Sequence, residues 1–449
     1  MTDVRIIGGG LAGCEASLQL ARRGMRVALY EMKPLKKTPA QKLDGLAELV
    51  CSNSFRSTKA GNAVALLKEE MALLGGVLIG LAKQAEVPAG DCLAVDRVEF
   101  SRLVEEAINN NPLIQVVHEE VIKLPIDGIP TILATGPLTS DPLANDLVKL
   151  IGQERLSFYD AIAPIIEAES VDMHNAFIAS RWRENEEGDY VNCPLTKEQY
   201  QEFVTRLNDS TRAQAHSFEH ACYFEGCLPL EVMAERGVET LRFGPMKASG
   251  LTDPKTGRWP YAVLQLRRED KYGASYNLVG CQTRMTIPEQ KEVFSIIPAL
   301  KNAKFMRYGA IHRNTYVNSP DVLDEFLRVQ DSQKNPTNVF LAGQISGVEG
   351  YVESMAMGLL VAYIVSHLSK TQTLFTLPEG SVLGGLYGHV RGAHRASPKD
   401  PYSPSNVTWA MVKPLLDTGR IGRKDKRLMM HERGVRVITE MIAGDNWLS

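Results

Sequence analysis

Six residues near the start of the chain have the types and the spacing that bind a dinucleotide. Gly8-Gly9-Gly10-Leu11-Ala12-Gly13 gives the pattern G-x-G-x-x-G between an expected strand and an expected helix. The first glycine permits a tight turn, the second lets the backbone approach a pyrophosphate, and the third allows close packing of helix on strand. Glu31 ends the next expected strand, where a carboxylate accepts hydrogen bonds from ribose hydroxyls. The pattern therefore predicts a dinucleotide with its phosphates at a helix N-terminus.

Two later segments indicate that the dinucleotide is FAD. Residues 132–137 (Ile-Leu-Ala-Thr-Gly-Pro) resemble a strand and Ala-Thr-Gly signature of flavoproteins that bind two dinucleotides. Residues 341–344 (Leu-Ala-Gly-Gln) resemble the late strand of those proteins, which leads into a helix aimed at the flavin ring. A simple NAD enzyme has no need of this second segment. The residues expected at FAD are Gly8, Gly9, Gly10, Leu11, Ala12, Gly13, Glu31, Val121, Thr135, Gly136, Gly343, Gln344, Gly350 and Tyr351.

The elements that must position these residues indicate an α/β fold, with an FAD/NAD(P)-binding, Rossmann-like domain of the glutathione-reductase type. Residues 4–7 and 27–30 have the pattern of buried parallel strands, and 11–23 that of the helix between them. A buried strand at 338–343 and a long apolar helix from 352 continue the domain near the other end of the chain. The expected divisions are the first part of the FAD-binding domain at 1–192, an inserted mixed α+β domain at 193–306, and the second part of the FAD-binding domain at 307–449.

Composition excludes several other classes of protein. The 449 residues are 44% hydrophobic and 23% charged, as in an ordinary globular protein, and exceed the usual size of a single core. The longest apolar stretch, 71–82, is too short to span a bilayer, and no targeting segment is evident, so no membrane role is expected.

The seven cysteines are an odd number without a C-x-x-C pair, which argues against a disulfide framework and a structural zinc site. Reduced thiols in the cytoplasm fit best. His216, His220 and Cys222 have metal-like spacing but no fourth ligand, so no metal is expected.

A basic segment near the C-terminus is the exception to a slightly acidic chain. The formal net charge is −3, yet residues 413–436 contain eight basic and three acidic residues. Such a segment is either a solvated helix face or a local surface for RNA. The candidate RNA-binding residues are Arg423, Lys424, Lys426 and Arg427.

Five further segments are long and unusual enough to indicate one family. They are 49–54 (Leu-Val-Cys-Ser-Asn-Ser), 93–97 (Leu-Ala-Val-Asp-Arg), 224–229 (Phe-Glu-Gly-Cys-Leu-Pro), 242–247 (Arg-Phe-Gly-Pro-Met-Lys) and 312–316 (His-Arg-Asn-Thr-Tyr). All five resemble the TrmFO family, the methylenetetrahydrofolate- and FAD-dependent tRNA (uracil-5-)-methyltransferases of bacteria. The resemblance runs from the N-terminus to about residue 392.

The resemblance implies methylation at C5 of a uridine in the T-loop of tRNA. The carbon would come from 5,10-methylenetetrahydrofolate and the hydride from FAD that NAD(P)H has reduced. Uracil C5 is a poor nucleophile until a thiolate adds at C6, after which C5 attacks a one-carbon iminium and loses its proton to a base. By match to the family motifs, Cys227 corresponds to the nucleophile and Cys51 to a cysteine with an assisting acid/base role.

The remaining candidate residues divide between the site and the core. His312 lies in a family block, where its ring could stack on the pterin, the alternative being a hydrogen-bonded structural histidine. Cys14, Cys92 and Cys281 are expected in the core.

The chain departs from the family pattern near its end. Where the family typically has Pro-Met-Asn-Ala-Asn-Phe-Gly, residues 404–410 are Pro-Ser-Asn-Val-Thr-Trp-Ala. Because this segment is close to the basic tail, we expect the departure to leave the flavin and thiol chemistry intact and to bear on which RNA is used. A ribosomal RNA uridine is the alternative substrate.

Other functions are less consistent with the sequence. The MnmG family, which modifies wobble uridine in tRNA, is much longer and has a histidine where this chain has Leu11. An FAD-binding module without turnover does not explain two matched thiols. An ordinary flavin oxidoreductase would oxidise NAD(P)H without methyl transfer. The NADH or NADPH preference and the oligomeric state stay open, and no protein partner is predicted.

Overall fold

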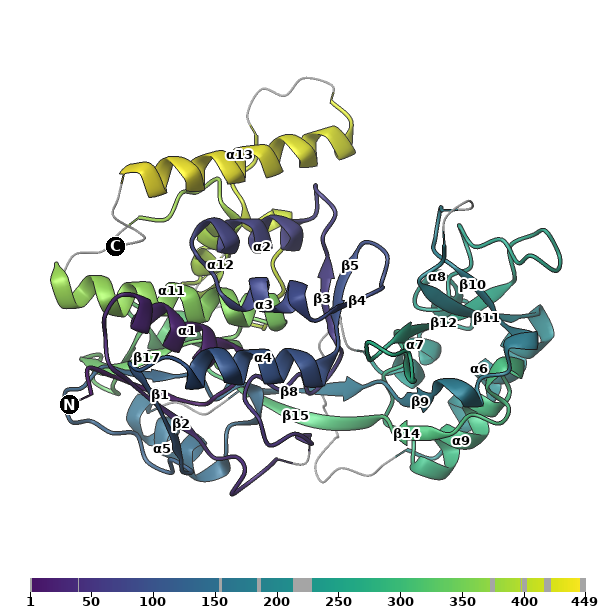
Figure 1. Cartoon of the computed structure of the whole chain (residues 1–449), viewed down its shortest axis with the longest axis horizontal. Helices are drawn as coiled ribbons and strands as arrows, with labels where there is room; N and C mark the ends of the chain where they lie inside the picture. Colours follow the sequence, from purple (N-terminus) through teal and green to yellow (C-terminus); the bar gives the residue numbers. More distant parts are fainter. Residues whose placement is uncertain are drawn as a thin grey trace.

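The chain forms a larger and a smaller unit that lie next to each other along the long axis of the molecule (Figure 1). The computed structural model describes residues 2–444 except 39, 153–155, 184–186, 213–227, 372–375, 396, 398–401 and 416–420. At 156–160 and 311–313 it describes the backbone but not the side chains. Both ends of the described chain belong to the larger unit.

The larger unit is built on a six-stranded sheet to which both halves of the chain contribute. Its strand order is β16-β17-β7-β1-β2-β6, and every neighbouring pair is parallel except β16 with β17. The strands are β1 (Val4–Ile7), β2 (Val27–Glu31), β6 (Ile114–His118), β7 (Thr131–Leu133), β16 (Arg328–Gln330) and β17 (Pro336–Leu341). Successive residues of a strand face opposite sides, so the burial of all of β7 means that both faces of the sheet are covered. The α/β fold expected from the sequence is confirmed.

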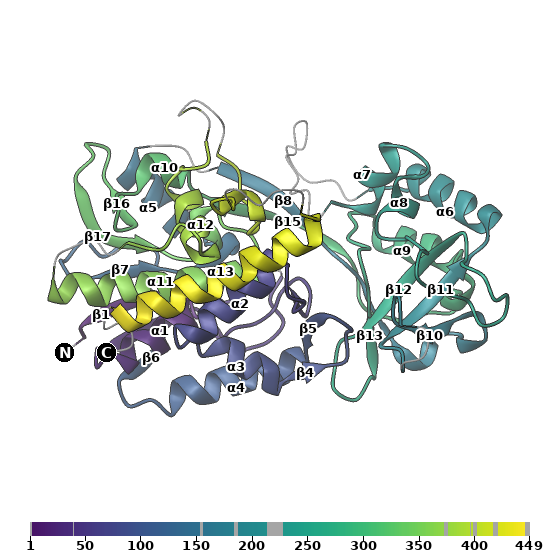
Figure 2. The same ribbon diagram turned by 90° about the horizontal axis from the view of Figure 1, so that it is seen from above.

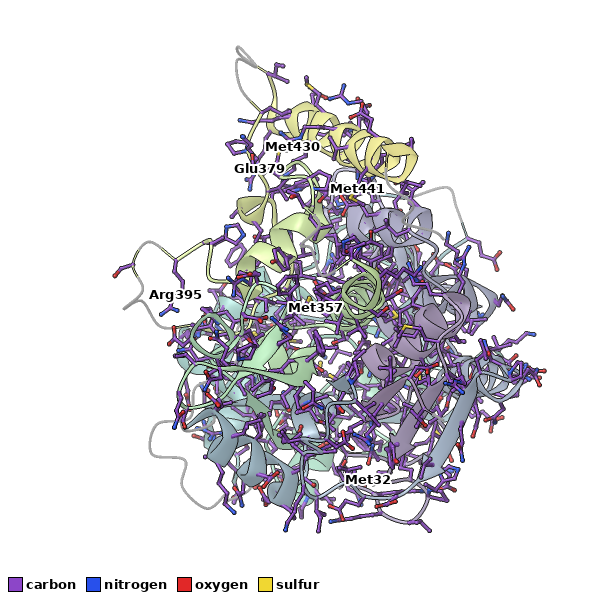
Figure 3. All side chains as sticks on the ribbon, turned by 90° about the vertical axis from the view of Figure 1, so that its left-hand side faces the viewer. Met32, Met357, Glu379, Arg395, Met430 and Met441 are labelled. Atoms are coloured by element: carbon purple, nitrogen blue, oxygen red, sulfur yellow. The ribbon has the colours of Figure 1, made fainter. Side chains whose placement is uncertain are left out.

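Two helices, α1 (Leu11–Arg22) and α11 (Tyr351–Lys370), pack closely against each other in this unit. A Cβ atom at Gly358 in α11 would lie 2.2 Å from the carbonyl oxygen of Ala12, so only glycine permits this approach. Every residue from Val352 to Ser366 is buried, and Met357 lies deep in the unit (Figure 3). The other helices are α2 (Ala63–Leu73), α3 (Leu78–Gln84), α4 (Arg97–Asn109), α5 (Asp141–Ile151), α10 (Ser319–Val322), α12 (Val382–Val390) and α13 (Arg423–Gly444).

The apolar character of α11 is that of a core helix. Among the described residues, α11 alone is long and apolar enough to cross a membrane by length and composition, with a mean hydropathy of 1.4. In the structure, however, 83% of that apolar window is buried within the molecule. The stretch 71–82, expected from the sequence to be the longest apolar run, is divided between the end of α2, a turn and α3.

The N-terminus of α12 is capped by a buried carboxyl group from α2. Glu70 accepts hydrogen bonds from the N–H groups of Val382 (2.8 Å) and Leu383 (2.7 Å). Burial raises the pKa of Glu70 to about 8. The side chain therefore joins two helices that are far apart in the sequence.

Replacing Glu70 by alanine is expected to lower the free energy of unfolding by about 1–3 kcal/mol, because two buried N–H groups lose their acceptor. Because the folded chain binds this proton more tightly than the unfolded chain, the contribution is full below pH 4.5 and declines as the pH rises towards 8. Thermal or denaturant unfolding at several pH values measures the difference. Glu99→Ala, at an exposed site, serves as the control, and equal losses for both variants would contradict the prediction.

The smaller unit contains a second six-stranded sheet. Its order is β10-β11-β12-β13-β9-β14, with all pairs antiparallel. The strands are β9 (Ile165–Glu167), β10 (Phe177–Ala179), β11 (Tyr190–Leu195), β12 (Ala262–Arg268), β13 (Ser275–Leu278) and β14 (Phe305–Arg307). The helices α6 (Lys197–Asp209), α7 (Leu230–Glu235), α8 (Thr240–Phe243) and α9 (Ile287–Ser295) accompany this sheet. Residues of the sheet and these helices share an apolar cluster separate from that of the larger unit.

Two adjacent strands connect the units. β8 (Leu156–Ile162) leads into the smaller unit and β15 (Ala310–Tyr316) leads out of it, and the two pair antiparallel, with Ile162 opposite Ala310. The strands of the second sheet already start at Ile165, ahead of the expected boundary at residue 193. We propose that the inserted unit runs from the end of β8 to the start of β15.

A small sheet of the larger unit lies next to the smaller unit (Figure 1). It consists of β3 (Ser54–Ser57), β5 (Cys92–Val95) and β4 (Glu86–Val87). Asn53, which precedes β3 and is fully buried, donates through its side-chain N–H groups to the carbonyl oxygens of Val95 (3.0 Å) and Arg268 (2.9 Å). This amide therefore joins the small sheet to strand β12 of the smaller unit.

Candidate functional site

The turn after β1 needs glycine at three positions for different reasons. Gly8 has a φ of +107°, and a Cβ atom there would lie 2.6 Å from the carbonyl oxygen of Ala134. A Cβ atom at Gly13 would lie 1.9 Å from the carbonyl oxygen of Gly8. At Gly10, by contrast, a Cβ atom would meet no atom within 4 Å. The turn is therefore tight at Gly8, closely packed at Gly13 and open at Gly10.

The start of α1 is open to an anion. Gly10 is the N-cap residue and has no side chain to accept a hydrogen bond from the first N–H groups of the helix. Unpaired N–H groups and the helix dipole together favour a bound phosphate. Glu31, at the end of β2, accepts a hydrogen bond from the Gly9 N–H (2.8 Å) and so fixes the turn in place.

A cavity with an empty volume of about 990 Å³ lies over this turn. It brings together most of the residues expected at FAD, although they come from segments far apart in the sequence. Those that line it are Gly8, Gly10, Leu11, Ala12, Glu31, Val121, Thr135, Gly136, Gly343, Gln344 and Tyr351. Gly9 and Gly13 support the turn without lining the cavity, and Gly350 lines a second cavity instead.

The second cavity adjoins the first and has an empty volume of about 1430 Å³. Residues of both units line it, among them Cys51 and Arg56 from the larger unit and Asn277 and Gln282 from the smaller one. Five residues line both cavities: Val50, Pro137, Leu138, Gln344 and Tyr351. The two cavities therefore lie side by side and share part of their walls.

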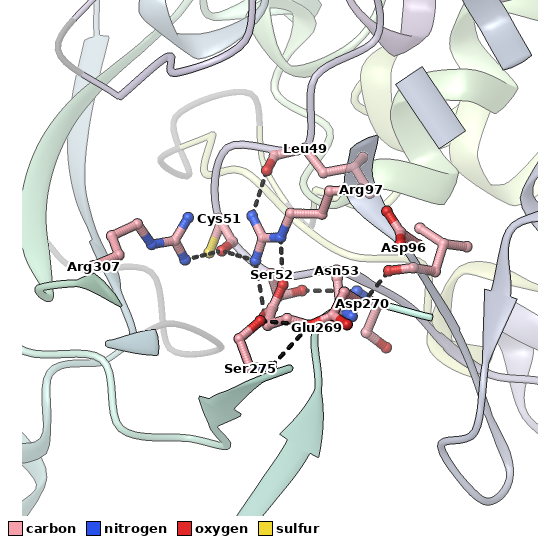
Figure 4. A network of polar contacts seen from close by, with 12 residues as sticks. Leu49, Cys51, Ser52, Asn53, Asp96, Arg97, Glu269, Asp270, Ser275 and Arg307 are labelled. Atoms are coloured by element: carbon pink, nitrogen blue, oxygen red, sulfur yellow. Dashed lines mark hydrogen bonds and ion pairs between the residues drawn. The ribbon is translucent and has the colours of Figure 1, made fainter. Parts of the chain in front are cut away.

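Hydrogen bonds to the backbone atoms of Cys51 hold this residue in place in the second cavity. Its N–H donates to the phenol oxygen of Tyr351 (2.7 Å) at the start of α11. Its carbonyl oxygen accepts hydrogen bonds from the guanidinium groups of Arg97 (2.9 Å) and Arg307 (3.0 Å). Figure 4 shows Cys51 between these two arginines. Three side chains from separate segments thus position one thiol.

The charges around Cys51 are partly balanced. Arg97 forms an ion pair with Glu269, with 2.6 Å between Nε and Oε2 (Figure 4). Although burial opposes it, the carboxylate of Glu269 raises the pKa of Arg97. Burial, with Arg97 nearby, lowers the pKa of Arg307 to about 10, so Arg307 still carries its charge at neutral pH. Burial raises the pKa of Tyr351, which keeps the phenol neutral. The thiol therefore has positive charge beside it.

The chain is similar to known proteins along most of its length. Residues 3–373 match the family model described as glucose inhibited division protein A. A methylenetetrahydrofolate–tRNA-(uracil-5-)-methyltransferase TrmFO of Geobacter sulfurreducens is 47% identical over 446 residues, which are 99% of each chain. A protein of the same name from Anaeromyxobacter dehalogenans is 51% identical over 428 residues, or 94% of each chain. The chain belongs to the TrmFO family.

The fold is also that of a solved structure. GidA of Aquifex aeolicus superposes with a TM-score of 0.66 over 98% of this chain and 76% of that chain, at 15% identity. At this identity the likeness concerns the fold alone. The resemblance to the TrmFO family that the sequence indicates is confirmed by the full-length relatives.

Several residues that the sequence singles out lie outside the described part of the chain. Cys227 is one of them, as are the possible metal ligands His216, His220 and Cys222. In the described residues no group of three or more His, Cys, Asp or Glu side chains could hold a metal. His312 belongs to β15 by its backbone, and its side chain is not described.

The other cysteines follow the expectation with one exception. Cys14 and Cys281 are buried, as expected, and burial raises the pKa of both thiols. Cys92, which we expected in the core, is only partly buried and lines the second cavity with Cys51. The sequence could not separate it from the core cysteines because it lies at the very start of a short strand, β5, whose other residues are buried.

The segment that departs from the TrmFO pattern lies at the second cavity. Asn406 lines this cavity and donates to the carbonyl oxygen of Glu349 (2.6 Å). The N–H of Val407 donates to the carboxylate of Glu353 (2.8 Å), which also pairs with Arg56. Hydrogen bonds to Glu349 and Glu353 thus hold this segment beside α11 and the cavity of Cys51.

The basic tail forms helix α13 on the outer side of α2 (Figures 1 and 2). Met430 (labelled in Figure 3) and His431 are buried side chains of this helix, and His431 Nε2 lies 2.8 Å from the carboxylate of Glu69 in α2. Arg423 and Lys424 are exposed, while Lys426 and Arg427 are half-buried. None of the four lines either cavity.

Proposed function

We propose that this protein is an FAD-dependent enzyme that methylates C5 of a uridine in tRNA. In this proposal 5,10-methylenetetrahydrofolate is the carbon donor and NAD(P)H reduces the FAD. The observation that carries it is that the dinucleotide cavity and the cavity of Cys51 lie against each other and share Gln344 and Tyr351 in their walls. The substrates follow from the names of relatives that match this chain along nearly its whole length.

The residues of the first cavity fit FAD. Gly10 leaves open space for a pyrophosphate at the start of α1, and Glu31 offers a carboxylate to the ribose. Gly343 and Gln344 continue the cavity towards Tyr351, where the flavin ring would face the second cavity. When bound and reduced, FAD supplies the hydride that completes the methyl group.

We assign the proton and thiol chemistry to two cysteines, of which Cys51 lines the second cavity. Cys227 supplies the sulfur that bonds to uracil C6, which lets C5 attack the methylene carbon. Cys51 takes the C5 proton as the bond between the methylene carbon and the folate nitrogen breaks and tetrahydrofolate leaves. Once this carbon has received its hydride, the C6–S bond breaks and the uracil ring is restored. The guanidiniums of Arg97 and Arg307 and the phenol of Tyr351 hold the backbone of Cys51 in place. His312 is proposed to contact the pterin.

The test is incubation of an unmodified tRNA transcript with purified protein, methylenetetrahydrofolate and NAD(P)H, followed by mapping of 5-methyluridine. We expect one modified uridine in the T-loop. A ribosomal RNA fragment in a parallel reaction separates the two substrates. NAD(P)H oxidation without methyl transfer to either RNA would refute the proposal in favour of a small-molecule oxidoreductase.

The proposal includes a role for α13 in RNA binding. Neutralising Arg423, Lys424, Lys426 and Arg427 together is expected to weaken tRNA binding and to reduce the salt slope by about 1 for each phosphate that these cations neutralise. Because these side chains line neither cavity, NAD(P)H oxidation should be unchanged. Affinities at several salt concentrations measure the slope.

A control variant removes four exposed cations on other elements: Arg102, Lys149, Lys197 and Lys301. It has the same total charge as the α13 variant. Equal slopes for the wild type and the α13 variant would show that α13 is a solvated face outside the RNA site. Action in the cytoplasm, expected from the unpaired cysteines, also belongs to the proposal.

A further inference from the structure

Two polar side chains of the smaller unit lie next to each other in the second cavity. Arg267 of β12 and Asn277 of β13 are directly opposite in the antiparallel ladder. Side chains of such a pair project from the same face of the sheet, with their Cβ atoms about 4.5–5.5 Å apart. Both line the cavity that contains Cys51. Neither was singled out by the sequence motifs.

Arg267 is a buried cation without a counter-anion. Its side chain is 7% exposed, and its Nε donates to the side-chain oxygen of Asn53 (3.0 Å). Within the part of the chain that the structure describes, no carboxylate forms an ion pair with it. Arg97, in the same region, has Glu269 as its partner. A buried charge without an opposite charge is unfavourable unless a ligand supplies one.

Asn277 offers a second unused donor at the same place. It is 3% exposed, and its Nδ2 is buried without a hydrogen-bond partner among the described residues. The buried Asn53 differs, because its Nδ2 donates to two carbonyl oxygens. Buried polar groups in folded proteins are nearly always paired, so an unpaired amide that lines a cavity indicates a missing acceptor.

We propose that Arg267 and Asn277 form an oxyanion subsite of the second cavity. The guanidinium supplies the charge and the amide N–H a further donor, the combination that binds a carboxylate or a phosphate. Two ligands of the proposed reaction, on which this inference rests, carry such a group: the glutamate carboxylates of the folate and the phosphates of the RNA. The subsite lies close to the thiol, because Asn53, the partner of Arg267, is two residues from Cys51.

Two variants of the FAD-loaded full chain test the subsite. Arg267→Gln removes the charge. Asn277→Asp places a carboxylate beside Arg267, so it should keep or raise the melting temperature while blocking any anionic ligand. Arg268→Gln is the matched control, because it removes a charge from the next residue of β12, which does not line the cavity.

The probes are tetrahydrofolate with tetrahydropteroate, which lacks the glutamate, and uridine monophosphate with uridine, which lacks the phosphate. We expect both variants to bind one of the two anionic probes about 30-fold or more weakly than the wild type does. Arg268→Gln should change the affinity for neither probe by more than about twofold. The variants should bind the matching probe without the anion as the wild type does. A lower affinity for tetrahydrofolate assigns the subsite to the folate carboxylate. A lower affinity for uridine monophosphate assigns it to the RNA phosphate.

Folded Asn277→Asp protein that binds both anionic probes with wild-type affinity overturns the subsite. If the wild type itself binds neither probe, the proposed function fails, and sulfate then tests the subsite alone. A sulfate-dependent rise in melting temperature of the wild type that Asn277→Asp loses supports the subsite. Equal rises in both proteins overturn it.

Discussion

Protein carrying Cys51→Ala is expected to form 5-methyluridine roughly 10²- to 10⁴-fold more slowly than the wild type while keeping its FAD, the range typical of a lost general acid or base. Cys51 lines the second cavity but not the first. Its contacts with Tyr351, Arg97 and Arg307 use backbone atoms, so alanine preserves them. The measurement is the rate of methyl transfer to tRNA, with flavin content and NAD(P)H oxidation determined on the same preparation.

Cys92 provides the control, because it lines the same cavity as Cys51 and we assign no chemistry to it. Cys92→Ala should methylate at close to the wild-type rate. Trapping with RNA that contains 5-fluorouridine separates the two assigned roles. The covalent adduct should persist in Cys51→Ala and vanish in Cys227→Ala. The reverse pattern would exchange the roles, and full activity of Cys51→Ala would remove Cys51 from the mechanism.

The second large effect is expected at the turn after β1. Gly10→Val should fold normally and lose FAD almost completely, because the new side chain has no protein atom to meet and fills the space left for the pyrophosphate. The ratio of flavin to protein absorbance after purification, with FAD titration of the apoprotein, gives the result.

Two other glycines serve as comparisons. At Gly80, in α3, a Cβ atom would also meet nothing within 4 Å, but Gly80 does not line the FAD cavity. Gly80→Val should therefore fold and retain FAD. Gly13→Val should fail to fold, because a Cβ atom there would lie 1.9 Å from the carbonyl oxygen of Gly8. Folded Gly10→Val protein with normal FAD content would show that the phosphates lie elsewhere.

The parts of this fold that the sequence predicts are those determined by local pattern. Runs such as 4–7 are typical of a buried parallel strand, and backbone geometry requires glycine at Gly8 and Gly13. The strands β9 and β10, which come before residue 193, were not predicted, because they have three residues each, too few to show an alternating pattern.

The second cavity was harder to predict for a different reason. Its polar residues, such as Arg267, Asn277 and Asn406, come from segments that only the folded chain brings together. Each of them is an ordinary polar residue in its own stretch of sequence. Cys51 and Cys227 became candidates only because they lie in segments that resemble a known family. One signal could have indicated Arg267: it is a charged residue in β12, a strand that is buried along nearly its whole length.

The strand order of the first sheet has a consequence for folding of the chain during its synthesis on the ribosome. β7 pairs with β1 on one side and with β17 on the other, and β17 is made only after the whole smaller unit. During synthesis the smaller unit can close around its own apolar cluster while β7 still has an open edge and α1 lacks its neighbour α11. A nascent chain released before residue 336 would therefore contain one finished unit and one unfinished sheet. Its unpaired edge at β7 is the kind of surface that chaperones cover and that aggregation exploits.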